Sequence, residues 1–359
     1  NHQTTFTAVF RPDETQSLTS YERLISHFTV TMRTYAEGGD LFVSPTGTSA
    51  GLGTMESPLD LDTAVAFAGA GQRIILLDGI YTREIKLEIK KHNNGRANRL
   101  KALFAAAGAR PVIDFGKKSE GVLLSGDYWH VRGIDFTRSA GNTKGFTVGG
   151  NHNIIENCRF YENGDTGLQI SRIDVTAPAP EWPSNNLILN CTSFANRDPA
   201  ENNADGFAAK LTVGDGNVFR GCIAYNNIDD GWDLYTKAGL GAIGPVLVED
   251  CIAYHNGFLL DGTVGKGDKN GFKLGGEGIS VPHLIRNCWA FGNGADGFTA
   301  NSNPGVILIN NIAYDNGRNL NLALYPGTVA NFQLDGFISY QRTKQERDIC
   351  PEELHAEQN

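Results

Sequence analysis

The sequence predicts an all-β fold, a parallel β-helix in which short strands wind into coils that stack on one another. One segment recurs six times without gaps between residues 155 and 316, and the shortest interval between copies is 23 residues, from Cys288 to Asn311. Each copy contains short alternating apolar runs, such as residues 246–248, bounded by Asn and Gly. No copy has the length or spacing of an amphipathic helix, so the pattern favours three short strands per coil.

Three positions of the repeat predict how the coils are held together. The first is cysteine in five copies, the position three residues later is always aromatic, and the position five residues later is always asparagine. The asparagines are Asn163, Asn196, Asn227, Asn256, Asn293 and Asn316. Because each amide can bond the same amide one coil away, we expect a structural asparagine ladder that does no chemistry.

The repeat cysteines are expected to be buried, reduced thiols. They are Cys158, Cys191, Cys222, Cys251 and Cys288, and a sixth, Cys350, lies near the C-terminus. Stacked about 4.8 Å apart with parallel side chains, they meet the geometry of a disulfide poorly. No Cys/His spacing in the sequence indicates zinc.

Residues 1–38 lack the repeat and form an appendage whose role the sequence does not define. After a strand from residue 41, residues 57–60 predict the start of a helix, with Ser57 as N-cap and Pro58 at the first helical position. Apolar positions 61, 64, 65 and 68 continue it as one stripe, so this helix is expected to cap the open end of the solenoid. Gly133 and Phe136 are interpreted as a degenerate first copy of the repeat, with Gly133 at the cysteine position.

The continuity of the repeat predicts one elongated domain over residues 39–340, followed by a charged tail over 341–359 that is either a helix or mobile. The chain has 359 residues, 43 glycines and a formal net charge of -9, which suits a single domain rich in turns. No apolar run approaches the ~18 residues that a membrane span needs. We expect a monomer with no nucleic-acid or membrane partner.

Acidic residues gather where three copies of a Gly-aromatic pair follow one another. Asp205 and Asp230 precede the glycine, Asp229 precedes Asp230, and Asp233 follows the aromatic residue. One Asp-Gly pair is explained by turn capping, as at Asp296. Several like charges at neighbouring positions repel unless a cation binds, and Ca²⁺ takes six to eight oxygens at about 2.3–2.6 Å. Stacked coils therefore predict a calcium site.

Lys273 takes the repeat position of Asp233, where the other copies have Gln169, Ala208 and Thr299, so the fold demands no lysine there. Either it is a surface charge paired with Asp233, or it is a general base whose pKa a nearby cation lowers. The reaction that needs both is β-elimination on a uronate: the cation binds the sugar carboxylate, the base takes the C5 proton and the C4 oxygen leaves.

Two further features predict a site for a long polyanion. Insertions at residues 171–183, 197–203 and 257–268 lengthen the coils around the acids and are expected to wall a groove along one face. Lys210, Lys237 and Lys269 are candidate substrate-binding residues, because lysines offset the repulsion between a polyanion and a net-acidic protein.

Three runs, residues 203–207 (NADGF), 229–233 (DDGWD) and 270–273 (NGFK), closely resemble polysaccharide lyase family 9, which comprises right-handed parallel β-helix enzymes typified by pectate lyases. The resemblance covers roughly residues 41 to 325. It implies that Asp205, Asp229, Asp230 and Asp233 bind Ca²⁺ and that Lys273 is the Brønsted base. It also implies an acidic plant cell-wall polysaccharide, pectin, as substrate. Such a polymer is too large to enter a cell, so we expect a secreted, cell-surface or periplasmic enzyme.

Three alternatives are weighed. The same family contains rhamnogalacturonan lyases, so rhamnogalacturonan I is an alternative substrate. A polygalacturonase would share the β-helix and use paired aspartates for hydrolysis, but its Gly-His-Gly and Arg-Ile-Lys motifs do not occur in the sequence. A non-catalytic, calcium-stabilised carbohydrate-binding β-helix would tolerate Lys273→Ala with little loss beyond affinity.

Overall fold

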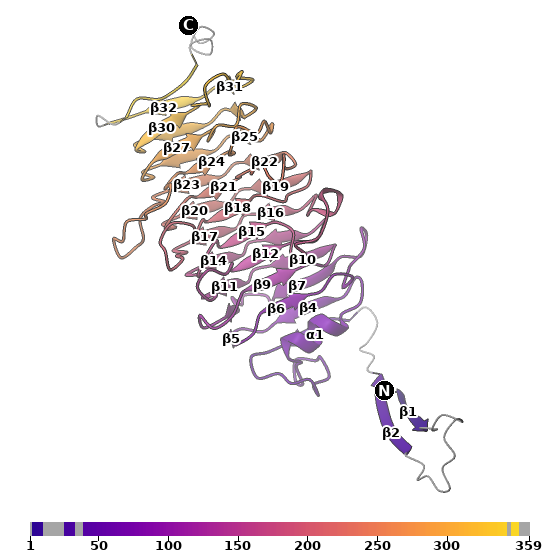
Figure 1. The fold of residues 1–359 in the computed structure, drawn as a ribbon. Coiled ribbons are helices and arrows are strands. Elements are labelled where there is room, and N and C mark those ends of the chain that lie inside the picture. Colours follow the sequence, from indigo (N-terminus) through magenta and orange to yellow (C-terminus); the bar gives the residue numbers. More distant parts are fainter. Residues whose placement is uncertain (1, 10–24, 33–38, 343–345, 352–359) are drawn as a thin grey trace. The chain divides into compact units, whose positions relative to one another are not determined.

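The structure is a computed structural model that describes residues 2–9, 25–32, 39–342 and 346–351. Its contacts divide the chain into two compact units, Asn1–Gly39 and Asp40–Asn359. In the first unit, β1 (His2–Val9) pairs antiparallel with β2 (Ile25–Met32). The second unit is a parallel β-helix, which confirms the predicted fold class (Figure 1).

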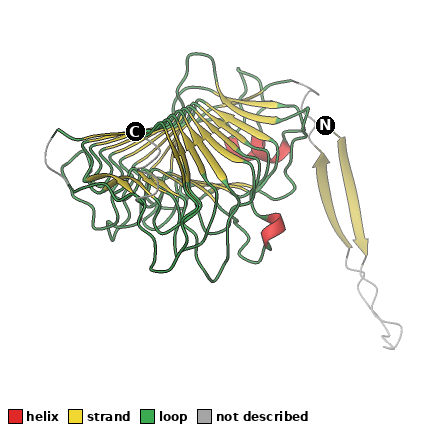
Figure 2. Cartoon of the chain, turned by 90° about the horizontal axis from the view of Figure 1, so that it is seen from above, coloured by secondary structure: helices red, strands yellow, loops and turns green. Residues whose placement is uncertain are grey.

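Each complete coil of the β-helix contributes one strand to each of three parallel sheets, and the incomplete first and last coils contribute fewer (Figure 2). The eleven-stranded sheet contains β3 (Leu41–Val43), β4 (Arg73–Leu76), β7 (Lys101–Ala105), β10 (Trp129–Arg132), β13 (Ile154–Glu156), β16 (Leu187–Leu189), β19 (Asn217–Arg220), β22 (Val246–Glu249), β25 (Leu284–Arg286), β28 (Ile307–Ile309) and β31 (Gln333–Asp335). The ten-stranded sheet contains β5 (Ile80–Thr82), β8 (Val112–Asp114), β11 (Asp135–Thr137), β14 (Arg159–Tyr161), β17 (Thr192–Phe194), β20 (Ile223–Tyr225), β23 (Ile252–Tyr254), β26 (Trp289–Phe291), β29 (Ile312–Tyr314) and β32 (Ile338–Tyr340). The nine-stranded sheet contains β6 (Leu87–Ile89), β9 (Val122–Leu124), β12 (Phe146–Val148), β15 (Leu168–Ile170), β18 (Phe207–Ala209), β21 (Trp232–Asp233), β24 (Phe272–Lys273), β27 (Asp296–Thr299) and β30 (Arg318–Asn321).

Stacked side chains fill the interior of the coils. Under the nine-stranded sheet, Trp232 packs between Phe207 and Phe272, with ring centroids 5.0 and 4.8 Å apart, and all three side chains are fully buried. Burial of one such side chain contributes about 1.5–3 kcal/mol. Because side chains alternate along a strand, the residue after each aromatic faces outward. The core thereby fixes which residues reach the outer face.

The predicted asparagine ladder is confirmed. Nδ2 of Asn196 donates to Oδ1 of Asn227 at 2.8 Å, and Nδ2 of Asn227 donates to Oδ1 of Asn256 at 3.0 Å. The ladder also explains the glycine of the repeat. A Cβ at Gly206 would lie 2.7 Å from Nδ2 of Asn227, and one at Gly231 would lie 2.8 Å from Nδ2 of Asn256. A larger residue would push the ladder aside.

A second asparagine ladder lies at the turn before the eleven-stranded sheet and was missed in the sequence. The backbone N–H of Asn153 donates to Oδ1 of Asn186 at 3.0 Å, and Nδ2 of Asn186 donates to Oδ1 of Asn217 at 3.0 Å. His283 has an equivalent role later in the stack, where its Nδ1 accepts the N–H of Val246 at 3.1 Å. As expected, the five repeat cysteines are buried and unpaired.

The predicted capping helix is present, but the predicted start was wrong. Helix α1 (Leu61–Phe67) has Asp60 as its N-cap, whose Oδ1 accepts the N–H of Thr63 at 2.7 Å. Ser57 is not the cap because Leu59 forms a parallel bridge with Val43, which keeps the chain out of the helix until Asp60. The 3₁₀-helix η1 (Ala179–Glu181) lies within the first insertion.

The register predicted for the first repeat copy was wrong by one residue. Phe136 lies opposite Phe160, and Thr137 lies opposite Tyr161. A shift of one residue moves a side chain to the other face of a sheet. Phe136 is therefore buried in the core and does not join the outer row of aromatic residues.

The described part of the C-terminal tail lies against the last coil. The N–H of Leu322 donates to the carbonyl of Ile349 at 2.8 Å, and Oδ1 of Asp348 accepts the N–H of Leu320 at 2.9 Å. Residues 346–351 thus extend the edge of β30, and the tail's other residues after 342 lie outside the described part of the chain. The alternatives of a terminal helix and a mobile tail receive no support from the described residues.

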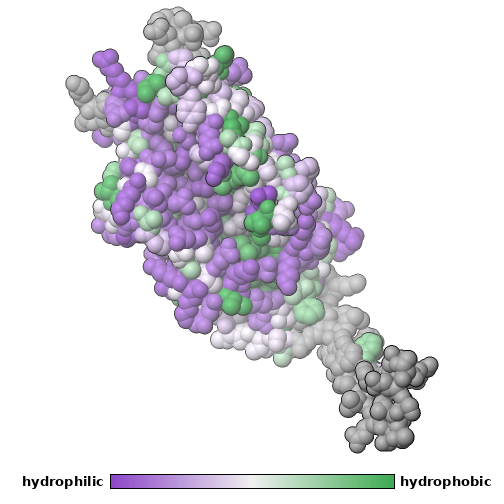
Figure 3. Space-filling model, in the orientation of Figure 1, coloured by the Kyte–Doolittle hydropathy of each residue, from purple (hydrophilic) through white to green (hydrophobic). Residues whose placement is uncertain are grey.

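The surface of the β-helix is polar on the face seen in Figure 3, where hydrophobic residues gather in small separate groups. Among the described residues, no helix has the length and apolar character to cross a membrane.

Candidate active site

The outer face of the nine-stranded sheet carries the predicted base on one of three adjacent strands. The aromatic residues of β18, β21 and β24 point into the core, so the residues after them face outward. Strand register places Ala208 opposite Asp233 and Asp233 opposite Lys273, as the aligned repeats predict. The side chains of Asp233 and Lys273 therefore share one face.

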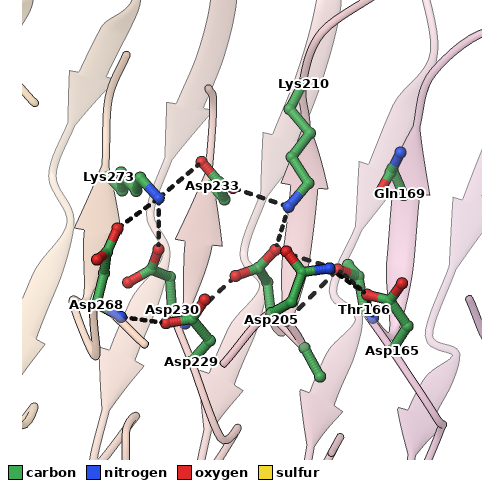
Figure 4. A network of polar contacts seen from close by, with 12 residues as sticks. Asp165, Thr166, Gln169, Asp205, Lys210, Asp229, Asp230, Asp233, Asp268 and Lys273 are labelled. Atoms are coloured by element: carbon green, nitrogen blue, oxygen red, sulfur yellow. Dashed lines mark hydrogen bonds and ion pairs between the residues drawn. The ribbon is translucent and has the colours of Figure 1, made fainter. Parts of the chain in front are cut away.

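Three of the four predicted metal ligands converge in the turn that leads into this sheet. Asp205, Asp229 and Asp230, here called the acidic cluster, each offer one carboxylate oxygen within 4.8 Å of the other two, and all three side chains are buried. Backbone groups of the next coil hold them. Oδ1 of Asp230 accepts the N–H of Asn270 at 2.7 Å. Oδ1 of Asp229 accepts the N–H of Asp268 at 2.5 Å (Figure 4).

Asp233, the fourth predicted ligand, is joined to the acidic cluster through Lys210. Nζ of Lys210 lies 2.8 Å from Oδ2 of Asp233 and 2.7 Å from Oδ2 of Asp205. Burial raises the pKa of Asp233, but the ammonium groups of Lys210 and Lys273 outweigh it and hold the pKa below its usual value. The fourth acid is thus ionised and faces the cluster across a lysine.

The acidic cluster fits a hard cation. Burial, aided by neighbouring carboxylates, raises the pKa of Asp205 to about 7 and that of Asp229 to about 6, and it raises the pKa of Asp230 well above its usual value. Oδ2 of Asp230 and Oδ1 of Asp233 are buried without a hydrogen-bond donor among the described residues. Within the described part of the chain, these two oxygens accept no hydrogen bond and face only the ammonium group of Lys273. Carboxylate oxygens are the ligands that Ca²⁺ prefers, and a cation would relieve the repulsion between them.

Lys273 lies among three carboxylates. Its Nζ is 2.7 Å from Oδ2 of Asp268, 3.4 Å from Oδ2 of Asp230 and 3.9 Å from Oδ1 of Asp233. Burial lowers the pKa of Lys273, but these carboxylates outweigh it and hold the pKa above its usual value. The lowered pKa expected from the sequence assumed a cation among these acids, and the carboxylates alone act in the opposite direction.

Sequence reasoning missed Asp268, the partner nearest to Lys273. It ends the insertion 257–268, and its side chain is 57% exposed. In the sequence it resembles any surface acid of a loop, because only the folded insertion returns it to β24. The structure therefore adds one loop carboxylate to the face that carries the predicted base.

The three candidate substrate-binding lysines differ in position. Lys210 is buried between carboxylates, as described above, so its ammonium group is already engaged. Nζ of Lys269 donates to the carbonyl of Gly267 at 2.7 Å. Lys237 is exposed, in a turn closed by a bridge to Gly241.

Two of the insertions support the acidic cluster. Oδ1 of Asp198 accepts the N–H groups of Asn203 and Ala204 at 2.9 and 3.2 Å, which fixes the chain directly before Asp205. Leu259 from the next insertion packs in a buried cluster with Ala204. The insertions 197–203 and 257–268, which the sequence predicts to wall a groove, thus also hold the chain before Asp205 in place.

Comparison with known proteins places this geometry in a family. Residues 41–331 match the family model described as "Pel9A-like, right handed beta helix region". The chain is 62% identical, over 97% of its length, to "Pectate lyase L" of Thermoclostridium stercorarium, and it spans 28% of the length of that relative. It is 44% identical to "Pectate lyase L" of Paenibacillus polymyxa, over 86% of this chain and 71% of the relative.

A solved structure agrees with the sequence relatives. The crystal structure of pectate lyase Pel9A superposes with a TM-score of 0.72 and 31% identity, over 87% of this chain and 78% of that one. Residues 41–331, which match the family model, contain every coil that carries the acidic cluster and Lys273. The chain therefore belongs to the Pel9A-like family of right-handed parallel β-helices, as the resemblance to polysaccharide lyase family 9 predicted.

Proposed function

We propose that this chain is a Ca²⁺-dependent polysaccharide lyase that cleaves pectate, a polymer of galacturonate, by β-elimination. The names of the similar proteins support the substrate, since all three reported above are pectate lyases. The observation that carries the chemistry is the position of Lys273. Its amine lies on the outer face of the sheet, 3.4 Å from a carboxylate of the acidic cluster.

The residues divide the reaction between them. Asp205, Asp229, Asp230 and Asp233 would hold Ca²⁺, which when bound supplies a positive charge for the uronate carboxylate and for the charge that develops beside it. Lys273, as the neutral amine, takes the proton from C5 of the sugar. The C5–H bond breaks as the C4–C5 double bond forms and the C4 oxygen leaves.

Lys273 must lose a proton before it can act as the base. The carboxylates that raise its pKa are the proposed ligands Asp230 and Asp233, together with Asp268. Compensation of the ligand charges by Ca²⁺ lowers that pKa, because less negative charge then faces the ammonium group. We expect activity to require Ca²⁺ and to rise toward alkaline pH.

Further assignments belong to this proposal. Exposed Lys237 is the candidate among the three lysines whose ammonium group the described contacts leave available to a polyanion. The ammonium group of Lys210 lowers the pKa of both Asp205 and Asp233, and with Lys273 it keeps Asp233 ionised. Because pectin is too large to enter a cell, the enzyme acts outside the cytoplasm.

The test is ultraviolet absorbance of unsaturated uronate, with polygalacturonate and rhamnogalacturonan I incubated in parallel with Ca²⁺ or with a chelator. Growth of the signal on polygalacturonate only with Ca²⁺ is expected. A signal only on rhamnogalacturonan I would replace the substrate but keep the chemistry. No signal on either polymer, with Ca²⁺ shown to bind, would favour a non-catalytic carbohydrate-binding β-helix.

A further inference from the structure

A cavity of about 710 Å³ lies beside helix α1, at the first coil of the β-helix. Its wall includes Val65 of α1, Glu88 of β6, Lys90 directly after β6 and Lys101 of β7. A second cavity of about 620 Å³ shares Glu88 and Lys90 and continues along the following coils to Arg172, after β15, but its wall also contains three further acids, Asp127, Asp174 and Glu181. Cavities of this size hold small organic ligands.

Lys101 is a buried cation without a carboxylate partner among the described residues. It is 7% exposed, its Nζ donates to Oδ1 of Asn93, and the ring centroid of Trp129 lies 5.6 Å away. Burial lowers the pKa of Lys101, and no nearby acid opposes this effect. A buried charge without a counterion is costly. An anion that entered the cavity would supply the missing partner.

The rest of the cavity wall adds positive charge. Exposed Lys86 and Lys90 also lack a carboxylate partner within the described part of the chain. The wall contains two acids. One of them, Asp62, already forms an ion pair, because Arg83 donates to both of its carboxylate oxygens at 3.0 and 2.8 Å. Glu88 offsets one charge. The cavity is therefore suited to a carboxylate.

A continuous row of outward-facing residues joins this cavity to the candidate active site. Strand register connects Glu88, Leu123, Thr147, Gln169, Ala208, Asp233 and Lys273 in that order. Six inter-strand steps of about 4.8 Å separate the ends of the row, so the cavity lies roughly 29 Å from Lys273. The side chains from Leu123 to Lys273 are themselves buried, so a polymer would contact the flanking loops, and one that ran along this side of the β-helix would reach both places.

We propose that the cavity beside α1 binds a remote segment of an anionic polysaccharide, with one of its carboxylates beside Lys101 and Lys90. The identity of the polymer as polygalacturonate rests on the proposed function, whereas binding of a carboxylate at this place does not. The site favours long chains over short ones, because a short chain at Lys273 does not reach it. The attraction weakens with salt, because ions screen the partly exposed lysines.

The test is calorimetric binding of galacturonate oligomers in the presence of Ca²⁺, in a Lys273→Ala background that prevents cleavage. One oligomer is a trimer, and the other has about twelve residues, which exceeds the roughly 29 Å separation. Lys90→Gln and Lys101→Met are each expected to weaken binding of the long oligomer about tenfold and to leave the trimer unchanged. Lys118→Gln, a change of an exposed lysine paired with Glu84, should alter neither affinity.

The outcomes separate this inference from the proposed function. Lys90 is exposed, so Lys90→Gln keeps the fold, and Lys101→Met replaces a buried charge by an apolar side chain of similar length. Equal affinities of the parent and both variants for the long oligomer would overturn the inference, even if polygalacturonate is cleaved. A selective loss for the long oligomer would support it, even if the absorbance assay detected no cleavage.

Discussion

Lys273 is the residue on which the proposed chemistry depends. A positioned general base contributes about 10²- to 10⁴-fold to a rate, so we predict that Lys273→Ala lowers kcat on polygalacturonate by about that factor. Binding of Ca²⁺, measured by calorimetry, should remain, because the substitution removes a positive charge beside Asp230 and Asp233. The matched control is Lys266→Ala, which removes an exposed lysine paired with Glu201. If kcat of Lys273→Ala is within about tenfold of the parent value, Lys273 is not the general base of the reaction.

His283 shows how one buried residue links stability to pH. Burial lowers its pKa to about 3 from the ordinary 6.5, so between these values the folded protein binds fewer protons than the unfolded chain. The contribution of neutral His283 to the free energy of unfolding is fully present above pH 6.5 and is lost as the pH falls toward 3. Asn217 fills the equivalent place in the ladder with an amide oxygen that accepts an N–H. An asparagine at position 283 should therefore keep the hydrogen bond to Val246.

We predict that His283→Asn removes this pH dependence. Below pH 6.5 the free energy of unfolding of the parent should fall relative to the variant, by about 1.4 kcal/mol per pH unit. Denaturant titrations of both proteins between about pH 7 and about pH 4.5 measure the difference. Parallel curves would show that the imidazole of His283 does not titrate between the folded and unfolded states.

At the scale of the element, the repeat glycine connects coil packing to the acidic cluster. A Cβ at Gly231 would lie 2.6 Å from the carbonyl oxygen of Gly271 and 2.8 Å from Nδ2 of Asn256. A Cβ at Gly297, two coils later, meets an equivalent clash with Asn316. The two glycines differ in what precedes them, because Asp230 belongs to the acidic cluster.

We predict that Gly231→Ala and Gly297→Ala both destabilise the β-helix, by about 1–3 kcal/mol each, since overpacking forces the ladder to shift. Only Gly231→Ala should also weaken Ca²⁺ binding, because the shift moves the carboxylate of Asp230. Thermal unfolding measures the first effect and calorimetry the second. Loss of Ca²⁺ affinity in both variants would indicate that the stack responds as a whole.

At the scale of the whole molecule, the repeat predicts the fold because equivalent positions of every coil make the same packing contacts. The asparagine ladder, the buried cysteines and the outward position of Lys273 all follow from that alignment. The second ladder left a weaker signal, since asparagine precedes the cysteine by five residues in three copies and Val246 and His283 then break the pattern.

Other features depend on contacts that no local pattern encodes. The start of α1 at Leu61 follows from the pairing of Leu59 with Val43. Asp268 reaches Lys273 only because an insertion folds back over the sheet. The cavity around Lys101 lies in the first coils, where the repeat is too degenerate to align. The sequence thus predicts what every coil shares and misses what single coils add.

The acidic cluster makes the stability of the β-helix depend on both pH and Ca²⁺. Asp205 has a folded pKa of about 7 and Asp229 of about 6, above the ordinary 3.8, so without a cation the folded protein binds more protons than the unfolded chain. The stabilisation from these protons is fully present below pH 3.8 and is lost as the pH rises through 6 and 7. At higher pH, Ca²⁺ bound to the same carboxylate oxygens would replace the protons and supply the stabilisation.

We therefore predict that the Tm measured in a chelator falls between about pH 5 and about pH 8, and that Ca²⁺ raises it most at the higher pH. At a Ca²⁺ concentration of about one hundred times Kd, binding adds about 2.7 kcal/mol. Asp230→Asn should reduce both the pH dependence and the effect of Ca²⁺, because one buried charge is then missing from the cluster. Asp296→Asn, outside the cluster, is the matched control and should retain the effect of Ca²⁺. An equal Tm with Ca²⁺ and with chelator at about pH 8 would mean that these carboxylates hold no cation.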